Sequence, residues 1–324
     1  MGMGMTFSSG NTKRRKLIDR EHEQREFQSL MTFESSFRIF MIQDEQGGMG
    51  KSLLLETLKT HCFEQEAAVC LIKFEEDFEY KSPFLFIQHI VEELKAFDLQ
   101  FPQFDKMEIA RKTGDLNSIY RFTTVEGSVN LEGATFDFAS KVEVTGVRID
   151  TQYVTINSTE LRPEHERDAQ ERSIDAFFND LRVICTTRPV VVMIDTYEKC
   201  RLLSHSDDNW QKLEAWLLRR LIKLLFDFEK RPSRLLLIIA GREVPNSDDI
   251  LVNSTRYAEV VKIIDEMSLW QREHVIEYLN LIGFRYEPKH VDMFCNMIEL
   301  GVSLLELMRF IDAAQKVQIR KSKT

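Results

Sequence analysis

One short stretch, residues 37–56, constrains the fold of this 324-residue chain more than any other part of it. It opens with an apolar run (37–42), continues through a glycine-rich turn (47–50), and enters a second apolar segment at Lys51 and Ser52. The first run predicts a buried strand and the second a helix, and glycine permits the tight turn between them. A strand, a turn and a helix in this order favour an α/β fold built on a parallel sheet.

The turn and the helix start have the chemistry of an anion cradle. Backbone N–H groups at a helix N-terminus point toward a bound anion, and the helix dipole adds to the attraction. We expect the Lys51 ammonium to reach the β- and γ-phosphates of a nucleotide and the Ser52 hydroxyl to bind Mg²⁺. The stretch resembles the Walker A motif of P-loop NTPases, G-x-x-x-x-G-K-[S/T]. This resemblance implies the ATP-binding residues Gln46, Gly47, Gly48, Met49, Gly50, Lys51, Ser52 and Leu53.

One position departs from this motif. The first glycine of the motif falls on Glu45, so the stretch reads E-Q-G-G-M-G-K-S. Glycine normally provides a positive φ or a close approach of the backbone to a ligand, and here that role passes to Gly47 and Gly48. We expect Glu45 to weaken or retune nucleotide binding. The alternative interpretation is a Gly-Lys-Ser helix start without a ligand.

A second set of candidate residues follows two later apolar runs. Residues 189–194 predict a strand buried on both faces, and Asp195 stands at its carboxyl end, where ligands bind in open α/β sheets. This resembles Walker B, which implies that Asp195 holds Mg²⁺ through water. Glu198 is the candidate to orient or deprotonate the attacking water, although such a glutamate more often directly follows the aspartate. After the run 233–241, Arg242 is the candidate to sense the γ-phosphate. The alternatives are a strand-ending turn at Asp195 and a surface arginine at Arg242.

Apolar runs alternate with helical patterns along the whole chain. Residues 100–119 predict one short helix and a loop. Further strands are expected at 68–74 and 258–264, and helices at 51–64, from 83, at 164–186, 208–230 and 269–283, from 288 and at 303–317. This alternation predicts a doubly wound, mainly parallel sheet.

The pattern divides the chain into three parts. Residues 1–16 are expected to form a flexible basic tail, residues 17–265 the P-loop core, and residues 266–324 a helical lid. Within the core, residues 121–157 alternate apolar and polar side chains between glycines, which predicts a β-rich insertion. The insertion is either an arm for assembly with itself or another protein or a passive wing packed on the core.

Composition and charge narrow the class of protein. Apolar residues make up 43% of the chain and charged residues 29%, as in globular proteins. The net charge of −9 argues against a broad nucleic-acid-binding surface, so we do not expect nucleic acid as a partner. The five cysteines show no metal-ligand spacing and favour a reduced, cytoplasmic setting. No apolar run approaches the roughly 18 residues of a membrane span, and the N-terminus lacks the apolar core of a signal peptide.

Four segments, read in order, resemble a STAND-type ATPase, a class of signal-transducing ATPases related to AAA proteins. They are residues 19–21, 47–52, 194–198 and 240–242. The resemblance implies that ATP binding and hydrolysis control self-assembly, that Arg20 lies near the adenine, and that a helical lid covers the nucleotide. It also implies ATP and ADP as ligands, with a homo-oligomer or a separate effector protein as partner. Such lids often carry a Gly-x-Pro element, and here Ser303 stands where the proline would be.

We therefore expect a Mg²⁺-dependent ATPase that works as a switch in signalling or defence. The expected catalytic residues are Lys51, Asp195, Glu198 and Arg242, and the expected metal ligands are Ser52 and Asp195. Two alternatives remain open: a non-hydrolysing scaffold stabilised by nucleotide, and a DNA-associated AAA-type loader ATPase. The seven histidines show no ligand spacing, and none of them is assigned chemistry.

Overall fold

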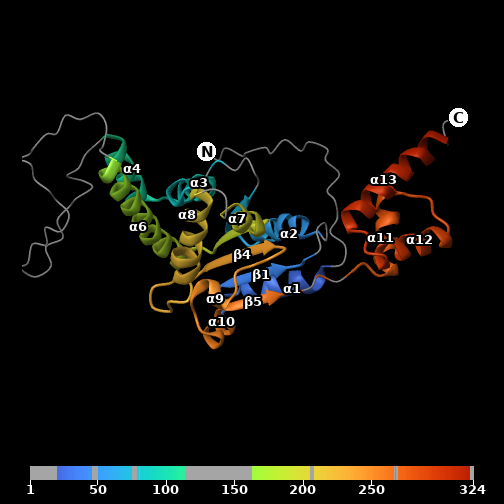
Figure 1. Cartoon of the computed structure of the whole chain (residues 1–324), viewed down its shortest axis with the longest axis horizontal. Helices are drawn as coiled ribbons and strands as arrows, with labels where there is room; N and C mark the ends of the chain where they lie inside the picture. The colour runs from blue at the N-terminus through green and yellow to red at the C-terminus, as the bar shows by residue number, and fades with distance from the viewer. Residues whose placement is uncertain are drawn as a thin grey trace, which may run out of the picture. The chain divides into compact units, whose positions relative to one another are not determined.

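The computed structural model describes residues 20–45, 50–74, 79, 81–113, 163–204, 208–265, 267 and 269–321. The chain divides into two compact units, one of residues 1–99 and 182–324 and the other of residues 100–181. The described helices and strands (Figure 1) are α1 (Glu21–Leu30), β1 (Ile39–Gln43), α2 (Lys51–Glu64), β2 (Ala68–Lys73), α3 (Pro83–Lys95), α4 (Pro102–Thr113), α6 (Pro163–Thr187), β3 (Val190–Asp195), α7 (Tyr197–Ser204), α8 (Asp208–Trp216), η1 (Leu217–Ile222), β4 (Leu235–Gly241), α9 (Ser247–Ile250), α10 (Ser254–Val260), β5 (Val261–Ile264), α11 (Arg272–Ile282), α12 (Pro288–Glu299) and α13 (Leu304–Lys321).

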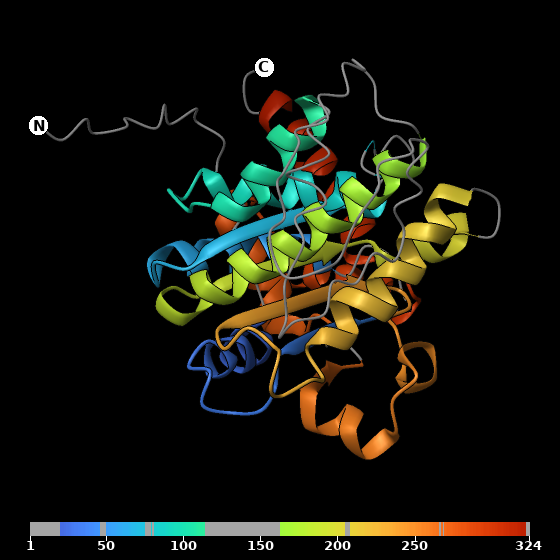
Figure 2. The same cartoon turned by 90° about the vertical axis from the view of Figure 1, so that its left-hand side faces the viewer.

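The first unit is built on one parallel sheet. Within the described residues this sheet has five strands in the order β2-β3-β4-β1-β5, and every neighbouring pair runs in parallel (Figures 1 and 2). β1 lies between β4 and β5, with Ile39 paired to Leu237 on one side and to Val261 on the other. The predicted α/β fold with a parallel, doubly wound sheet is confirmed.

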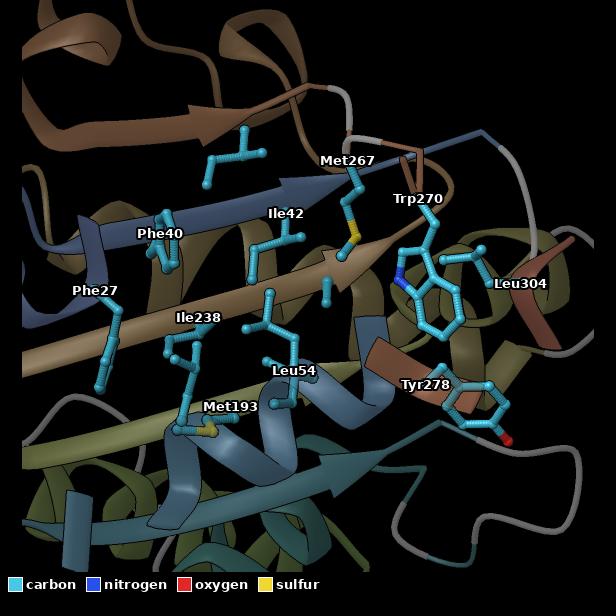
Figure 3. Packing of buried hydrophobic residues seen from close by; sticks show 14 of the residues in the cluster. Phe27, Phe40, Ile42, Leu54, Met193, Ile238, Met267, Trp270, Tyr278 and Leu304 are labelled. Atoms are coloured by element: carbon cyan, nitrogen blue, oxygen red, sulfur yellow. The ribbon is translucent and has the colours of Figure 1, made fainter. Parts of the chain in front are cut away.

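Both faces of the sheet are buried, which explains the unbroken apolar runs in the sequence. Phe40 and Ile42 point to the face that packs on α1 and α2, where Phe27 and Leu54 join the same cluster (Figure 3). The side chain of Met41 points to the other face, because successive side chains of a strand alternate, and it too is fully buried. Parallel strands that are covered on both sides need apolar residues at every position rather than at every second one.

The order of the strands reverses beside β1. The chain leaves β1 through α2 and passes β4 and β3 to reach β2, at the far edge of the sheet. It leaves β4 in the opposite direction and crosses β1 to reach β5. In open α/β sheets ligands bind outside the carboxyl ends of the strands at such a reversal. The topology therefore directs attention to the ends of β1 and β4.

Several helix boundaries follow from signals in the sequence. The Ser82 hydroxyl accepts the Leu85 N–H ahead of α3, and a proline occupies the first position of that helix. Gly283 ends α11 with a φ of 70°, a left-handed conformation that glycine adopts at little cost. Before α13, Ser303 and Glu306 form a reciprocal pair in which each side chain accepts the other residue's N–H.

Two of the predicted elements that differ in their bounds do so for a clear local reason. The strand expected at 258–264 begins only at Val261, because the Asn253 side chain accepts the Arg256 N–H and starts helix α10 ahead of it. The helix expected at 208–230 passes into the π-helical segment η1 and ends earlier. The Asp227 side chain accepts the N–H groups of residues 229 and 230 there and forms a turn instead.

The second unit contains α4 and most of α6. One Asp180 carboxylate oxygen accepts the N–H groups of Gln103 and Phe104, each at 2.9 Å, and so caps the start of α4. Arg111 lies 3.0 Å from a Glu108 oxygen on its own helix and 2.7 Å from a Glu166 oxygen on α6. These bonds tie the two helices together. The predicted tail (1–16) and β-rich insertion (121–157) lie outside the described residues.

The helices expected in the region 266–324 are present as α11, α12 and α13. Side chains from this region, among them Trp270, Tyr278 and Leu304, belong to one buried cluster with residues of the sheet (Figure 3). The rings of Trp270 and Tyr278 have their centroids 5.3 Å apart. In the described part of the chain, no helix combines the length and the apolar character that crossing a bilayer would require.

The packing of α2 against the sheet gives a stability prediction. Leu58 is fully buried in the cluster, so Leu58→Ala should leave a cavity and lower the free energy of unfolding by about 2–5 kcal/mol. Leu202 on α7 is 66% exposed, and Leu202→Ala should change the free energy of unfolding by less than about 0.5 kcal/mol. Chemical denaturation of the two variants measures the difference. Equal stability of both would contradict the packing described for α2.

Candidate functional site

The candidate residues gather at the carboxyl ends of three adjacent strands. Asp195 is the last residue of β3, Gly241 is the last residue of β4, and Asp44 directly follows β1. The Asp44 N–H donates to the Gly241 carbonyl at 3.2 Å, which continues the sheet pairing by one residue. The site therefore lies at the end of the sheet where the strand order reverses.

Helix α2 begins at this edge, directly after Gly50. Gly50 has a φ of 90°, a left-handed conformation that favours glycine, and its carbonyl accepts the Leu54 N–H. The turn residues Gln46, Gly47, Gly48 and Met49 lie outside the described part of the chain. Glu45, at the motif's first position, is exposed, and Leu53 on α2 is half-buried. The expected effect of Glu45 on nucleotide binding stays a prediction.

Ser52 and Asp195 interact across the two elements. The Ser52 side chain lowers the pKa of the Asp195 carboxyl by hydrogen bonding, and Asp195 is only 4% exposed. Burial raises the pKa of Asp195, while the Ser52 hydrogen bond and the nearby Lys73 act in the opposite direction. A buried carboxylate and a neighbouring hydroxyl offer two oxygen atoms as possible ligands for a cation.

This oxygen pair fits Mg²⁺. The cation commonly binds through one or two protein oxygens and completes its octahedral shell with phosphate oxygens and waters. Ser52 lies at the first turn of α2 and is exposed, whereas Asp195 reaches it from the neighbouring layer of the sheet. The two residues predicted to hold the metal are thus brought together, and they come from elements far apart in the sequence.

Lys51 lies within the same electrostatic environment. Its ammonium nitrogen donates to the Asp44 carbonyl oxygen at 2.7 Å. Burial lowers the pKa of Lys51, whereas the negative charges of Asp44, Glu198 and Asp195 oppose this shift. The expected catalytic groups Lys51, Asp195, Glu198 and Arg242 all interact electrostatically in the folded chain.

Glu198 and Arg242 form a contact that sequence reasoning missed. Glu198 lies in the first turn of α7, and its Oε2 accepts the backbone N–H of Arg242 at 3.0 Å. The Arg242 Nε lies 3.9 Å from the other Glu198 oxygen, but the Arg242 side chain is 60% exposed. The main-chain bond therefore fixes the Glu198 carboxylate at the tip of β4, while the guanidinium remains open to solvent.

Two backbone features make that contact possible. A Cβ on Gly241 would lie 2.7 Å from the Glu198 Oε2 and 2.7 Å from the Glu243 carbonyl oxygen, closer than real Cβ atoms come. Thr196, between Asp195 and α7, has a φ of 62°, which is rare for a β-branched residue and costs about 1–3 kcal/mol. The chain thus turns sharply after β3 and brings Glu198 against a glycine.

Further charged residues surround the site. Lys73 ends β2 and pairs with Glu56 of α2 at 2.8 Å, and its charge acts on Asp195. Arg20, expected near an adenine, directly precedes α1 and is only 2% exposed. The adenine contact of Arg20 stays a prediction. Asp44 and Lys73 were not singled out by sequence reasoning, although each stands at the end of a predicted strand.

Comparisons with protein-family models and with curated proteins give no match. Three solved structures of archaeal proteins are similar in fold. For the ORC2 protein of Aeropyrum pernix in its ADP form, the TM-score is 0.48 and the identity 11%, over 95% of this chain and 65% of that one. For the Walker-type ATPase of Pyrococcus abyssi, the TM-score is 0.46 and the identity 13%, over 98% of this chain and 78% of that one. For the Aeropyrum pernix ORC1 protein in complex with DNA, the TM-score is 0.45 and the identity 11%, over 97% of this chain and 63% of that one.

The likeness to these structures is low. The parallel α/β fold of this chain is shown by its own strand order, β2-β3-β4-β1-β5. The chain spans less than two thirds of the length of the two ORC proteins, at 65% for ORC2 and 63% for ORC1. The expectation that nucleic acid is not a partner of this chain stays a prediction.

The close approach at β4 gives a prediction for Gly241→Ala. The new methyl group would displace the Glu198 carboxylate and lower the free energy of unfolding by about 1–3 kcal/mol. In a Glu198→Ala background one of the two close contacts is absent, so the same substitution should cost measurably less. A double-mutant cycle by chemical denaturation measures this coupling. Strict additivity would mean that the Glu198 side chain does not lie against Gly241.

Proposed function

We propose that this chain is a Mg²⁺-dependent ATPase that works as a conformational switch. The observation that carries the proposal is the gathering of Lys51, Ser52 and Asp195 at one edge of the sheet. There the Lys51 ammonium donates to the Asp44 carbonyl at 2.7 Å and interacts with the charges of Asp195 and Glu198. A hydroxyl, a carboxylate and an ammonium at the start of a helix are the groups that a metal-bound triphosphate requires.

The proposed binding set is the turn and first helical residues, Gln46, Gly47, Gly48, Met49, Gly50, Lys51, Ser52 and Leu53. Lys51 binds the β- and γ-phosphates after leaving the Asp44 carbonyl oxygen, and Arg20 lies near the adenine. Ser52 and Asp195 hold Mg²⁺, which when bound neutralises charge on the phosphate oxygens. Because Lys51 and Asp195 are already positioned and desolvated, little reorganisation is needed when charge develops.

The proposed roles of Glu198 and Arg242 follow from their contact. Glu198 orients or deprotonates the attacking water, and its bond to the Arg242 N–H keeps the carboxylate in one orientation. The exposed guanidinium of Arg242 is left to sense the γ-phosphate. Loss of that phosphate would remove the partner of Arg242 and change the contacts at the tip of β4, which is how nucleotide switches transmit hydrolysis.

The finer assignment is a STAND-type switch that controls assembly with itself or with an effector protein. The tie between the C-terminal helices and the sheet through one buried cluster supports a role for these helices as a lid. Light scattering with and without ATP and Mg²⁺ tests assembly. An unchanged mass in both conditions would remove the self-assembly part of the proposal.

Two other functions would use the same core. A non-hydrolysing scaffold is favoured by Glu45 in place of the first motif glycine, and a phosphate-release assay separates it from an enzyme. A DNA-associated AAA-type loader is favoured by the basic run 13–16 and opposed by the net charge of −9. Gel-shift titrations at several salt concentrations test it, because DNA binding through phosphates weakens steeply with salt.

Lys51→Ala should abolish detectable ATP binding, because it removes the ammonium that is proposed to bind both the β- and the γ-phosphate. Isothermal titration calorimetry with ATP and Mg²⁺ measures the affinity. Lys59→Ala, on the same helix, is the matched control and should bind ATP as the wild type does. Unchanged affinity in Lys51→Ala would refute the phosphate cradle.

Glu198→Gln should keep ATP bound while kcat falls at least about 100-fold, the scale expected for loss of a general base. The amide retains an oxygen to accept the Arg242 N–H, so the site geometry should persist. Glu243→Gln, in an exposed neighbour, controls for loss of a negative charge near the site. Steady-state phosphate release measures kcat for both variants. Normal turnover in Glu198→Gln would show that Glu198 is not a catalytic residue.

A further inference from the structure

Asp44 connects three parts of the site, although none of the proposed roles uses it. Its N–H donates to the Gly241 carbonyl at the tip of β4, and its own carbonyl accepts the Lys51 ammonium at 2.7 Å. One oxygen of its carboxylate accepts the backbone N–H of Met267 at 3.1 Å. Asp44 is 7% exposed, so its charge is buried together with these contacts.

Met267 lies in the short segment between β5 and α11, which leads into the C-terminal helices. Its side chain is 4% exposed and belongs to the buried cluster with Trp270 (Figure 3). The Asp44–Met267 hydrogen bond thus holds the main chain at Met267, where the side chain of this residue enters the core. A change in that bond would change how firmly the segment is held.

We infer that Asp44 is a positioning residue that couples the Lys51 ammonium to the segment 265–270. The inference rests on the proposed function, since the coupling requires that a phosphate group draws Lys51 away from Asp44. When the ammonium leaves, the buried carboxylate loses a favourable charge and depends more on its remaining donors, among them the Met267 N–H. Binding of ATP should therefore tighten the Asp44–Met267 bond.

A merely structural aspartate would behave differently. It would hold the segment 265–270 equally well whether or not nucleotide is present, and its removal would loosen the segment by the same factor in both states. A coupling residue changes the opening of the segment and the affinity for ATP together. Because binding free energies are reciprocal, each ligand state must shift the other by the same factor.

The test is hydrogen–deuterium exchange of residues 265–271 in the full chain, with and without ATP and Mg²⁺, together with calorimetric Kd values. In the wild type, ATP should slow exchange of this segment by at least about fivefold, the lower end of typical coupling between sites. In Asp44→Ala, exchange should be faster without nucleotide, and the response to ATP should be lost. Asp265→Asn, a neutralised acid in the same segment, is the control and should respond as the wild type does.

Asp44→Asn separates the hydrogen bond from the charge and serves if the alanine variant does not fold. Its amide oxygen still accepts the Met267 N–H, so protection without nucleotide should be retained. The slowing of exchange by ATP should be smaller, because a neutral amide has no charge–charge interaction with the Lys51 ammonium to lose. A wild-type response to ATP in either Asp44 variant would overturn the inference.

The two proposals fail in different ways. If the wild type binds ATP and its segment does not respond, the coupling is wrong and the ATPase proposal stands. If the wild type shows no ATP binding by calorimetry, the proposed function falls, and the coupling falls with it.

Discussion

The parallel pairing of β1 with β4 sets the geometry of the candidate site. Gln43 pairs with Gly241, so the next residues of the two strands, Asp44 and Arg242, leave the sheet at the same level. β3 pairs with β4 in the matching register, and this brings Asp195 to the same edge. A slip of one residue would turn each side chain to the opposite face. The burial of both faces makes such a slip costly, and the apolar core thereby fixes the positions of the polar groups.

Burial acts on the two central charges in opposite directions. It raises the pKa of Asp195 and lowers the pKa of Lys51, so in both cases the ionised form is disfavoured by the loss of water. Each charge offsets part of the cost of the other, and the Ser52 hydroxyl and the Asp44 carbonyl contribute hydrogen bonds. The free energy of folding offsets the cost of removing water from both groups, so this cost does not recur when a ligand binds. A ligand with complementary charges meets groups that are already oriented.

The elements that follow from local signals could be predicted, and the contacts between distant residues could not. Apolar runs gave the strands, and the Gly-Lys-Ser sequence gave the start of α2, because both depend on residues close in the chain. The true start of β5 depends on the cap at Asn253, a local signal that the apolar run 258–264 concealed. The Glu198–Arg242 bond spans 44 residues, and the Asp44–Met267 bond spans 223. No spacing rule reaches over such separations, and only the strand order brings these residues together.

Thr196 has a consequence for how the parts after β3 can rearrange. Its left-handed backbone lies in a small allowed region that is separated from the α and β regions by steric clashes. Small movements of α7 about this residue therefore stay within the left-handed region. A larger turn at Thr196 has to cross the steric barrier to the α or β region, which limits how far α7 can move away from Asp195.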